Sequence, residues 1–171
     1  MVKEYHQEYL KGIAPVKIWE EKVSLLSGKC IEHLVIDMLG DMIGELTGKV
    51  VGQRIVGHYG GPLKLERTLE SKGKILGTEV SFLAKPWAME WPQGGMFSKG
   101  HGVMMTKTGE KAELHGSGIS IPGKGPGWNI RGVRYLQTKS AALSRLNNVA
   151  LVFEIEIAPD GSYDDKMWEW K

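Results

Sequence analysis

The chain has 171 residues, of which 42% are hydrophobic and 25% are charged, and its net charge is +2. These values are typical of one globular domain with a full core, and they exclude a strongly basic or acidic surface that would attract nucleic acid or anionic lipid. Cys30 is the only cysteine, which excludes an intramolecular disulfide and a cysteine-rich zinc site.

The first twelve residues predict an N-terminal extension (1–12) within a single domain that spans residues 1–171. They lack the apolar run of a signal peptide, and no segment reaches the roughly 20 apolar residues of a membrane-spanning helix. The single cysteine favours an intracellular location. We therefore expect a cytoplasmic protein without a membrane partner.

Residues 34–56, LVIDMLGDMIGELTGKVVGQRIV, carry glycine at every fourth position from Gly40 to Gly52. The even positions from 34 to 52 are all apolar or glycine, and the polar residues lie at odd positions, which is the alternation of a half-buried strand. Residues 31–46 also fit a helical period, so a helix is the alternative. We favour the strand because each glycine inside a helix costs about 1 kcal/mol against alanine. Glycines on the inner face of such a long strand allow it to curl around a narrow interior, as in a barrel.

Three turn signals separate alternating runs further along the chain: ESKGKIL at Gly73, TKTGEKAEL at Gly109, and IAPDGSYD at Asp160 and Gly161. Each predicts a hairpin. Only residues 139–148 look helical, with Ser140 as an N-cap, which allows at most one short helix at about 140–147. The pattern predicts an all-β fold, an antiparallel and mostly up-and-down barrel of about eight strands.

Two arginines fall on faces that are otherwise apolar. Arg54 lies on the even face of residues 34–56, and Arg67 shares its face with three leucines. A guanidinium inside a barrel needs a carboxylate or an anionic ligand, because an unpaired buried charge is strongly destabilising. Both arginines are therefore candidate ligand-binding residues. The alternatives are an arginine that emerges at a strand end, or a salt bridge to an acidic residue such as Glu66, Glu79 or Glu154.

The aromatic residues form a second candidate set. The segment KPWAMEWPQGGMF, residues 85–97, places Trp87 and Trp91 in a Pro- and Gly-rich connection between strands, and Trp128 and Tyr135 lie on either side of the next such loop. Residues of this kind cover a cavity, plug a barrel mouth or form an oligomer interface, and the sequence does not separate the three roles. All four are candidate ligand-binding residues.

The motifs of serine hydrolases, phosphate-binding loops and zinc proteases are absent. The segment PGKGPG, residues 122–127, favours a mobile loop over a phosphate cradle, because no Ser or Thr follows its lysine. No pair of histidines has ligand spacing, so we expect neither a metal nor a cofactor. His101 and His115 are candidate ligand-binding residues. With Tyr135 and Glu154 they are also candidates for acid–base work, but the sequence identifies no catalytic residue.

Three segments resemble, in the same order, the conserved landmarks of a family of small uncharacterised bacterial proteins with the allene oxide cyclase type of barrel. They are VKIWEEK (16–22), GDMIGE (40–45) and HGSGI (115–119). The resemblance implies an eight-stranded, calycin-like barrel with an interior cavity, in a homo-oligomer. It carries over no catalytic residue.

We expect the barrel to bind a small apolar or amphipathic molecule, such as a fatty acid derivative with a carboxylate. One alternative is an isomerase or cyclase that acts on a similar molecule, and another is a non-enzymatic, homo-oligomeric assembly protein. Nucleic acid is not an expected partner, because no basic stripe interleaves with the aromatic residues.

Overall fold

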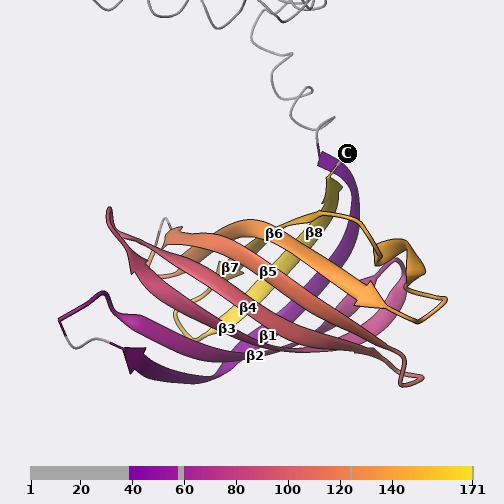
Figure 1. Ribbon diagram of the computed structural model, residues 1–171, viewed down its shortest axis with the longest axis horizontal. Coiled ribbons are helices and arrows are strands. Elements are labelled where there is room, and N and C mark those ends of the chain that lie inside the picture. The colour runs from indigo at the N-terminus through magenta and orange to yellow at the C-terminus, as the bar shows by residue number, and fades with distance from the viewer. Residues whose placement is uncertain (1–38, 58–59, 124, 171) are drawn as a thin grey trace, which may run out of the picture. The chain divides into compact units, whose positions relative to one another are not determined.

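The computed structural model describes residues 39–57, 60–123 and 125–170. In this part of the chain eight antiparallel strands form a closed barrel (Figure 1). The strands are β1 (Leu39–Gly57), β2 (Lys64–Ile75), β3 (Thr78–Trp91), β4 (Gly95–Thr106), β5 (Lys111–Pro122), β6 (Trp128–Thr138), β7 (Leu151–Ile157) and β8 (Ser162–Trp170). Each strand pairs with the next along the chain and β8 closes on β1, so the predicted all-β, up-and-down barrel of eight strands is confirmed.

Several predictions lie outside the described residues. These are the N-terminal extension (1–12), the segment VKIWEEK (16–22), Cys30 and the choice between strand and helix for residues 31–38. Residues 39–46 belong to β1 and are strand.

The face that β1 turns to the barrel interior changes twice along the strand. Leu46 is 1% exposed and follows the predicted even face, but Met42 is 54% exposed while Ile43 is 7% exposed. The pairing of β1 with β8 is irregular at Met42, and the pairing with β2 shifts between Val50 and Gly52. Because an extra residue in one strand reverses the inward and outward faces beyond it, the even-position pattern fails at both places.

At two positions of β1 a glycine is required because a neighbouring strand packs too closely for a side chain. A Cβ on Gly48 would collide with the Glu70 carbonyl oxygen and the Tyr163 ring, and a Cβ on Gly44 would lie 2.8 Å from Ile75 Cγ1. A Cβ on Gly52 would meet nothing nearer than 3.6 Å. The predicted role of inward-facing glycines in a tightly curled sheet therefore holds at positions 44 and 48.

Two of the three predicted hairpin turns are confirmed. Gly109 and Gly161 have φ of +85° and +83°, a region that favours glycine, and each lies between paired strands. The turn predicted at Gly73 is wrong, because Gly73 lies inside β2 and the chain turns at Leu76 and Gly77. A Cβ on Gly73 would overlap the Glu45 carbonyl, so this glycine also serves close packing.

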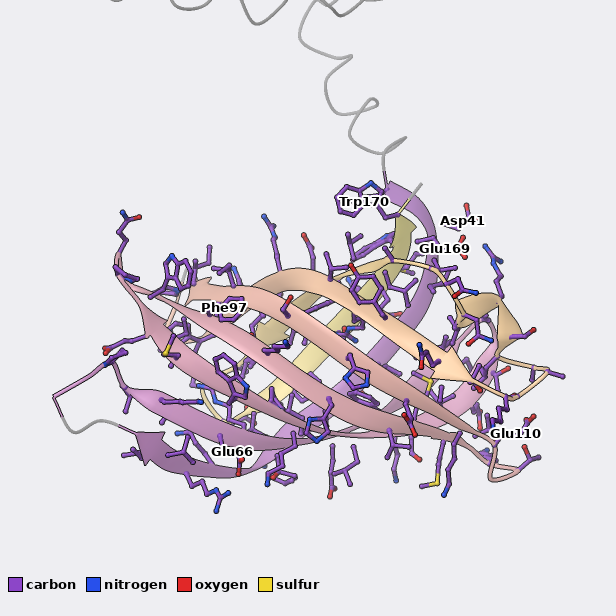
Figure 2. All side chains as sticks on the ribbon, viewed as in Figure 1. Asp41, Glu66, Phe97, Glu110, Glu169 and Trp170 are labelled. Atoms are coloured by element: carbon purple, nitrogen blue, oxygen red, sulfur yellow. The ribbon has the colours of Figure 1, made fainter. Side chains whose placement is uncertain are left out.

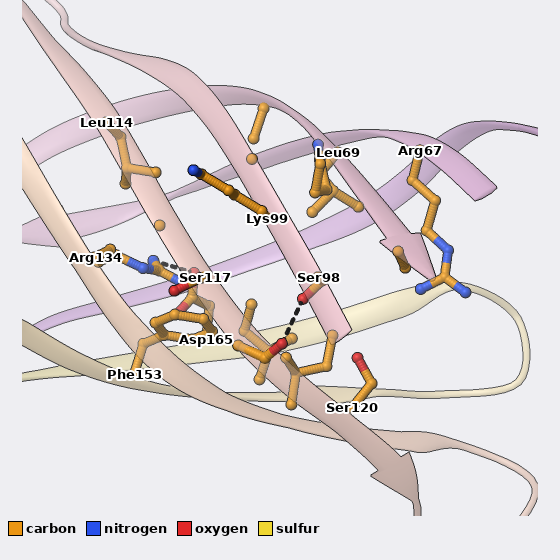
Figure 3. Close-up of a pocket in the computed structure, with 18 of the residues that line it drawn as sticks. Arg67, Leu69, Ser98, Lys99, Leu114, Ser117, Ser120, Arg134, Phe153 and Asp165 are labelled. Atoms are coloured by element: carbon orange, nitrogen blue, oxygen red, sulfur yellow. Dashed lines mark hydrogen bonds and ion pairs between the residues drawn. The ribbon is translucent and has the colours of Figure 1, made fainter. Parts of the chain in front are cut away.

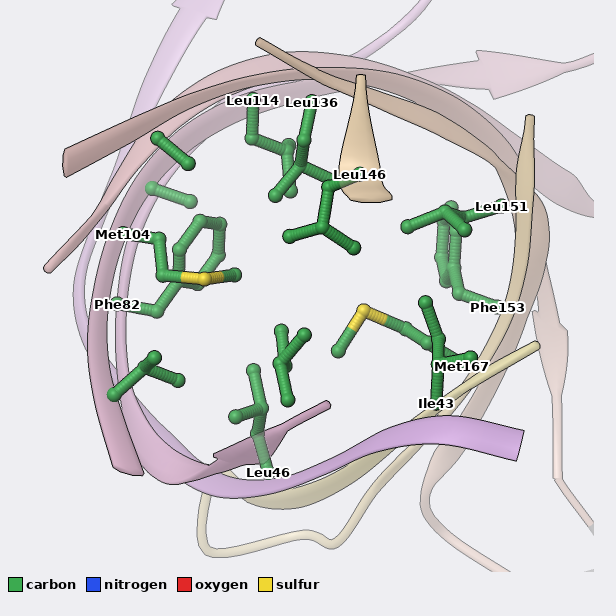
Figure 4. Close-up of a cluster of buried hydrophobic side chains, with 14 of the residues drawn as sticks. Ile43, Leu46, Phe82, Met104, Leu114, Leu136, Leu146, Leu151, Phe153 and Met167 are labelled. Carbon is green, nitrogen blue, oxygen red and sulfur yellow. The ribbon is translucent and has the colours of Figure 1, made fainter. Parts of the chain in front are cut away.

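The connection from β6 to β7, residues 139–150, fills one end of the barrel, which we call the plugged end. Its single helical turn is the 3-10 helix η1 (Ser144–Leu146), where a short helix at about 140–147 is predicted. Ser140 Oγ accepts a hydrogen bond from the Leu143 amide at 3.3 Å, but the N-cap of η1 is Leu143, so the prediction of Ser140 as the N-cap is wrong. Leu143 and Leu146 are fully buried among apolar side chains of the barrel interior (Figure 4).

Arg145 ties this connection to the barrel wall. Its guanidinium lies 2.7 Å from Glu169 of β8 and 3.8 Å from Asp41 of β1, and the two carboxylates lie near each other at the same end (Figure 2). These ion pairs help to keep Leu143 and Leu146 of the connection inside the plugged end of the barrel.

The opposite end, where β1, β3, β5 and β7 finish, is called the cavity end. A small second cluster lies there, formed by Leu65, Ala88 and Met96 with Leu63 and Trp128 packed against it. The barrel interior between this cluster and the plugged end is incompletely filled, and it holds the candidate site.

Candidate functional site

A cavity of about 80 Å³ lies inside the barrel toward the cavity end and is partly open to solvent (Figure 3). Its position follows from the strands: Arg67, Ser98 and Ile130 lie near the starts of β2, β4 and β6, and Ser120 lies near the end of β5, all at the cavity end. The interior is a cavity at this level because much of the wall lacks large side chains.

The wall of the cavity is mostly apolar. Glycine and alanine contribute much of it, and they leave room for the aromatic rings of Phe82 and Phe153. A Cβ on Gly118, which lines the cavity, would lie 3.2 Å from the Phe153 ring. The apolar lining residues are Leu69, Phe82, Ala84, Pro86, Ala88, Leu114, Ile130, Phe153, Ile155 and Ile157.

Arg67 lies on the inner face of β2 between Leu65 and Leu69, as its alternation predicts, and it lines the cavity. Its Nε donates a hydrogen bond to Gln53 Oε1 at 2.8 Å. No carboxylate of the described residues lies within salt-bridge distance of it, so the predicted alternative of an ion pair with an acidic residue does not apply. Burial lowers the pKa of the Arg67 guanidinium, which nevertheless remains charged.

A second cationic group lies deeper in the barrel, in an ion pair. Arg134 of β6 donates from Nη1 to Asp165 Oδ2 of β8 at 2.8 Å, and the two side chains are only 5% and 2% exposed. The Arg134 guanidinium also lies 3.9 Å above the Phe153 ring and 3.2 Å from Met167 Sδ. Both members of the pair line the cavity.

The two oxygens of the Asp165 carboxylate have different surroundings. Oδ2 accepts the hydrogen bond from Arg134, whereas Oδ1 has no hydrogen-bond partner among the described residues. The hydroxyl of Ser120, another lining residue, is also without a partner there. Burial raises the pKa of Asp165 and the charge of Arg134 opposes the rise. Burial likewise raises the pKa of the neighbouring Tyr163 hydroxyl.

The prediction that Arg54 faces the barrel interior is wrong. Its side chain is 67% exposed and pairs with Glu66 at 2.6 Å on the outer face, and Lys85 reaches the same carboxylate at 3.2 Å. The cause is the register shift between Val50 and Gly52, which turns position 54 outward. The salt bridge to Glu66 that the sequence left as an alternative is the one that forms.

Trp87 and Trp91 do not lie in a connection between strands, as predicted, but within β3. Their positions alternate with the inward-facing residues, so they lie on the outer face, where each ring centroid is 5.7 Å from that of Phe97. The ammonium group of Lys64 lies 4.5 Å from the Trp87 ring. The two tryptophans are therefore separated from the cavity by the sheet.

His101, His115 and Tyr135 form a row on the outer face of neighbouring strands. His101 of β4 pairs with His115 of β5, which pairs with Tyr135 of β6. All three residues are exposed, and Tyr135 is 55% exposed. His101 borders the cavity, although its place in β4 turns the imidazole outward. Glu154 also lies outside and pairs with Arg131 at 2.9 Å.

Trp128 lies at the cavity end, where it contacts both the small cluster and the main core. Of the eight predicted site residues, Arg67 and His101 thus border the cavity, and Trp128 packs in the small cluster at the cavity end. The predicted set lacks four polar residues that line the cavity: Ser120, Arg134, Tyr163 and Asp165. A signal was present in two strands, because Arg134 shares its face of β6 with Ile130 and Leu136, and Asp165 shares its face of β8 with Tyr163 and Met167.

No protein-family model matches the sequence, and no curated protein matches it. Solved structures do resemble the barrel. A protein of unknown function from Clostridium acetobutylicum ATCC 824 has a TM-score of 0.66 at 12% identity, with 77% of this chain and 95% of that chain covered. A conserved protein of unknown function from Rhodopseudomonas palustris has a TM-score of 0.65 at 10% identity, with 75% and 95% covered.

An enzyme from Penicillium herquei has a TM-score of 0.53 at 12% identity, with 77% of this chain and 96% of that chain covered. At these identities the likeness of all three structures concerns the barrel fold alone.

Within the described ranges, no three His, Cys, Asp or Glu side chains gather in the way that metal ligands do. The same ranges contain no helix with the length and apolar character that crossing a bilayer requires.

Proposed function

We propose that the barrel binds a small, largely apolar molecule that carries an anionic group such as a carboxylate. The observation that supports this most directly is Arg67, a guanidinium that lines an apolar cavity without a carboxylate partner among the described residues. A partly buried cation in apolar surroundings favours an anion that would pair with it.

The size of the cavity limits the ligand. Pockets for drug-sized ligands measure roughly 300–1,000 Å³, whereas this cavity measures about 80 Å³. The ligand is therefore either small and slender, or it extends from the cavity into the open mouth. An unbranched aliphatic carboxylate fits this description better than a bulky ring system.

Isothermal titration calorimetry with unbranched carboxylates from butanoate to decanoate tests the proposal. Replacing Arg67 with methionine keeps an unbranched, flexible side chain but removes the guanidinium and its charge, so we expect affinity to fall roughly 10-fold or more. Arg54→Met is the matched control, because Arg54 lies on the neighbouring strand and points outward. The proposal fails if wild-type protein binds none of the carboxylates, or if the two variants lose affinity equally.

A second candidate function, an isomerase or cyclase acting on a similar molecule, is favoured by Asp165. A carboxylate beside an apolar cavity, with a pKa raised by burial, suits proton transfer to and from a bound molecule. The enzyme from Penicillium herquei has a similar barrel. Because isomerisation conserves mass, incubating the protein with a metabolite extract should convert one component into another of equal mass, and Asp165→Asn should abolish the conversion.

A further inference from the structure

Only one of the two oxygens of the Asp165 carboxylate has a hydrogen-bond partner among the described residues. Its Oδ2 accepts from Arg134 at 2.8 Å, its Oδ1 has no partner among the described residues, and the residue is 1% exposed. A buried acceptor without a donor is destabilising, more so when it carries charge. A hydrogen-bond donor from a bound molecule would therefore stabilise Asp165 Oδ1.

A buried ion pair is weak evidence for a purely structural role. Buried ion pairs can often be replaced by apolar side chains of similar volume with no loss of stability, because desolvation offsets their attraction. Here Arg134 fixes the carboxylate from one side, and the Phe153 ring and Met167 sulfur hold Arg134 in turn. These contacts orient Asp165 so that Oδ2 accepts the hydrogen bond from Arg134 and Oδ1 remains able to accept another.

The unsatisfied atoms lie where the ligand is proposed to bind. Asp165 and Ser120 both line the cavity and come from different strands, β8 and β5. Arg67, the proposed partner of the anionic group, lies well apart from the Arg134–Asp165 pair in the view of the pocket (Figure 3). The cavity therefore offers a cation at one place and a hydrogen-bond acceptor at another, with apolar wall between them.

We infer that the ligand carries a hydroxyl group that donates its hydrogen to Asp165 Oδ1, in addition to the anionic group that faces Arg67. This defines the ligand class as a hydroxy-carboxylate with an apolar body. The inference rests on the proposed function, because it assumes that the ligand occupies this cavity.

The experiment compares wild-type affinities for matched pairs of probes. Each pair consists of an ω-hydroxy acid and the acid in which a methyl group replaces the hydroxyl, from 5-hydroxypentanoate with hexanoate to 8-hydroxyoctanoate with nonanoate. The series removes the need to know the distance between Arg67 and Asp165 beforehand. At the best chain length we expect the hydroxy acid to bind about 10- to 100-fold more tightly, as for a hydrogen bond to a charged group.

A variant locates the effect. In the double variant Arg134→Met/Asp165→Leu we expect the preference for the hydroxyl to vanish, while the methyl acid still binds through Arg67. Circular dichroism establishes whether this variant is folded. If it does not fold, the wild-type comparison still decides the matter.

The outcomes separate the two proposals. The inference is overturned if the hydroxy and methyl acids bind wild-type protein equally at every length, or if the methyl acids bind better. In that case Asp165 Oδ1 accepts its hydrogen bond from trapped water, and the proposed function stands. If no acid of either kind binds, the proposed function fails and the inference fails with it. A preference for the hydroxyl that survives in the double variant also overturns the inference.

Discussion

The two ends of the barrel are built from the same eight strands but are filled in different ways. At the plugged end, Leu136, Leu143, Leu146, Leu151 and Met167 are at most 1% exposed, and they form one apolar cluster. Toward the cavity end, glycine, alanine and serine on the inner face leave an opening of about 80 Å³ that contains charged groups. The difference indicates that inner-face composition, rather than strand topology, decides where this barrel is filled by a core and where it encloses a cavity.

The largest expected effect concerns the charged pair. Arg134→Met should lower the free energy of unfolding by about 3–5 kcal/mol at neutral pH, because it leaves the Asp165 carboxylate buried and unpaired. The double variant Arg134→Met/Asp165→Leu should recover most of this loss. Urea denaturation monitored by circular dichroism measures both. A double variant as unstable as the single one would mean that the ion pair itself contributes to the stability of the barrel, as the buried leucines of the plugged end do.

The same variant makes a prediction about pH. Burial raises the pKa of Asp165 in the folded protein above its unfolded value, so the folded state holds this proton more tightly. Without Arg134 nothing opposes that rise. The stability deficit of Arg134→Met relative to wild type should therefore shrink as pH falls from neutral toward about 4, the usual pKa of an aspartate. A deficit that is constant with pH would contradict this origin.

At the plugged end the cost of a change comes from lost packing. Leu146→Ala should lower the free energy of unfolding by about 2–5 kcal/mol, since the side chain is fully buried and its removal leaves a cavity. Leu83→Ala is the control, because Leu83 is 47% exposed on the outer face. Urea denaturation should show a much smaller effect for Leu83. Comparable losses for the two leucines would argue that the connection does not plug the barrel.

The smallest expected effect concerns larger side chains, which the cavity end should tolerate better than the plugged end. Ala112 is 1% exposed near the plugged end, and Ala112→Leu should destabilise by about 1–3 kcal/mol through overpacking. Ala84 borders the cavity, so Ala84→Leu should be nearly neutral because it fills open space. Thermal unfolding of the two variants gives the comparison. Equal losses would show that the cavity is not available to an added side chain.

The barrel class and the inward position of Arg67 could be predicted from the sequence, because alternation survives along most strands. The placement of Arg54 could not, because the shift after Val50 leaves no mark in composition. For Trp87, the Pro- and Gly-rich composition of residues 85–97 predicts a connection, because proline is rare in a strand that is paired on both sides. In the structure, pairing of β2 with β3 skips from Trp87 to Ala84, so on that side of β3 Pro86 lies where no ladder pairing forms.

Asp165 was overlooked for a different reason. Trp168 and Trp170 are the largest apolar side chains of β8 and lie on the face opposite to Asp165, yet Trp170 is 55% exposed and Met167, on the face of Asp165, is fully buried. The meeting of Arg134 with Asp165 depends on the closure of β8 onto β1 and on the register of three strands. Alternation within one strand gives its faces but contains no information on which side chains converge across a barrel.

The plugged end has a kinetic consequence. The barrel wall is a continuous ladder of paired strands and the leucines fill one end, so within the described part of the chain a molecule reaches the cavity through the other end and leaves by the same route. For the ligand proposed above, a side chain that narrowed this passage without contacting the molecule would raise the barriers for entry and exit equally. It would change how fast the ligand arrives and how long it stays, but it would not change the dissociation constant.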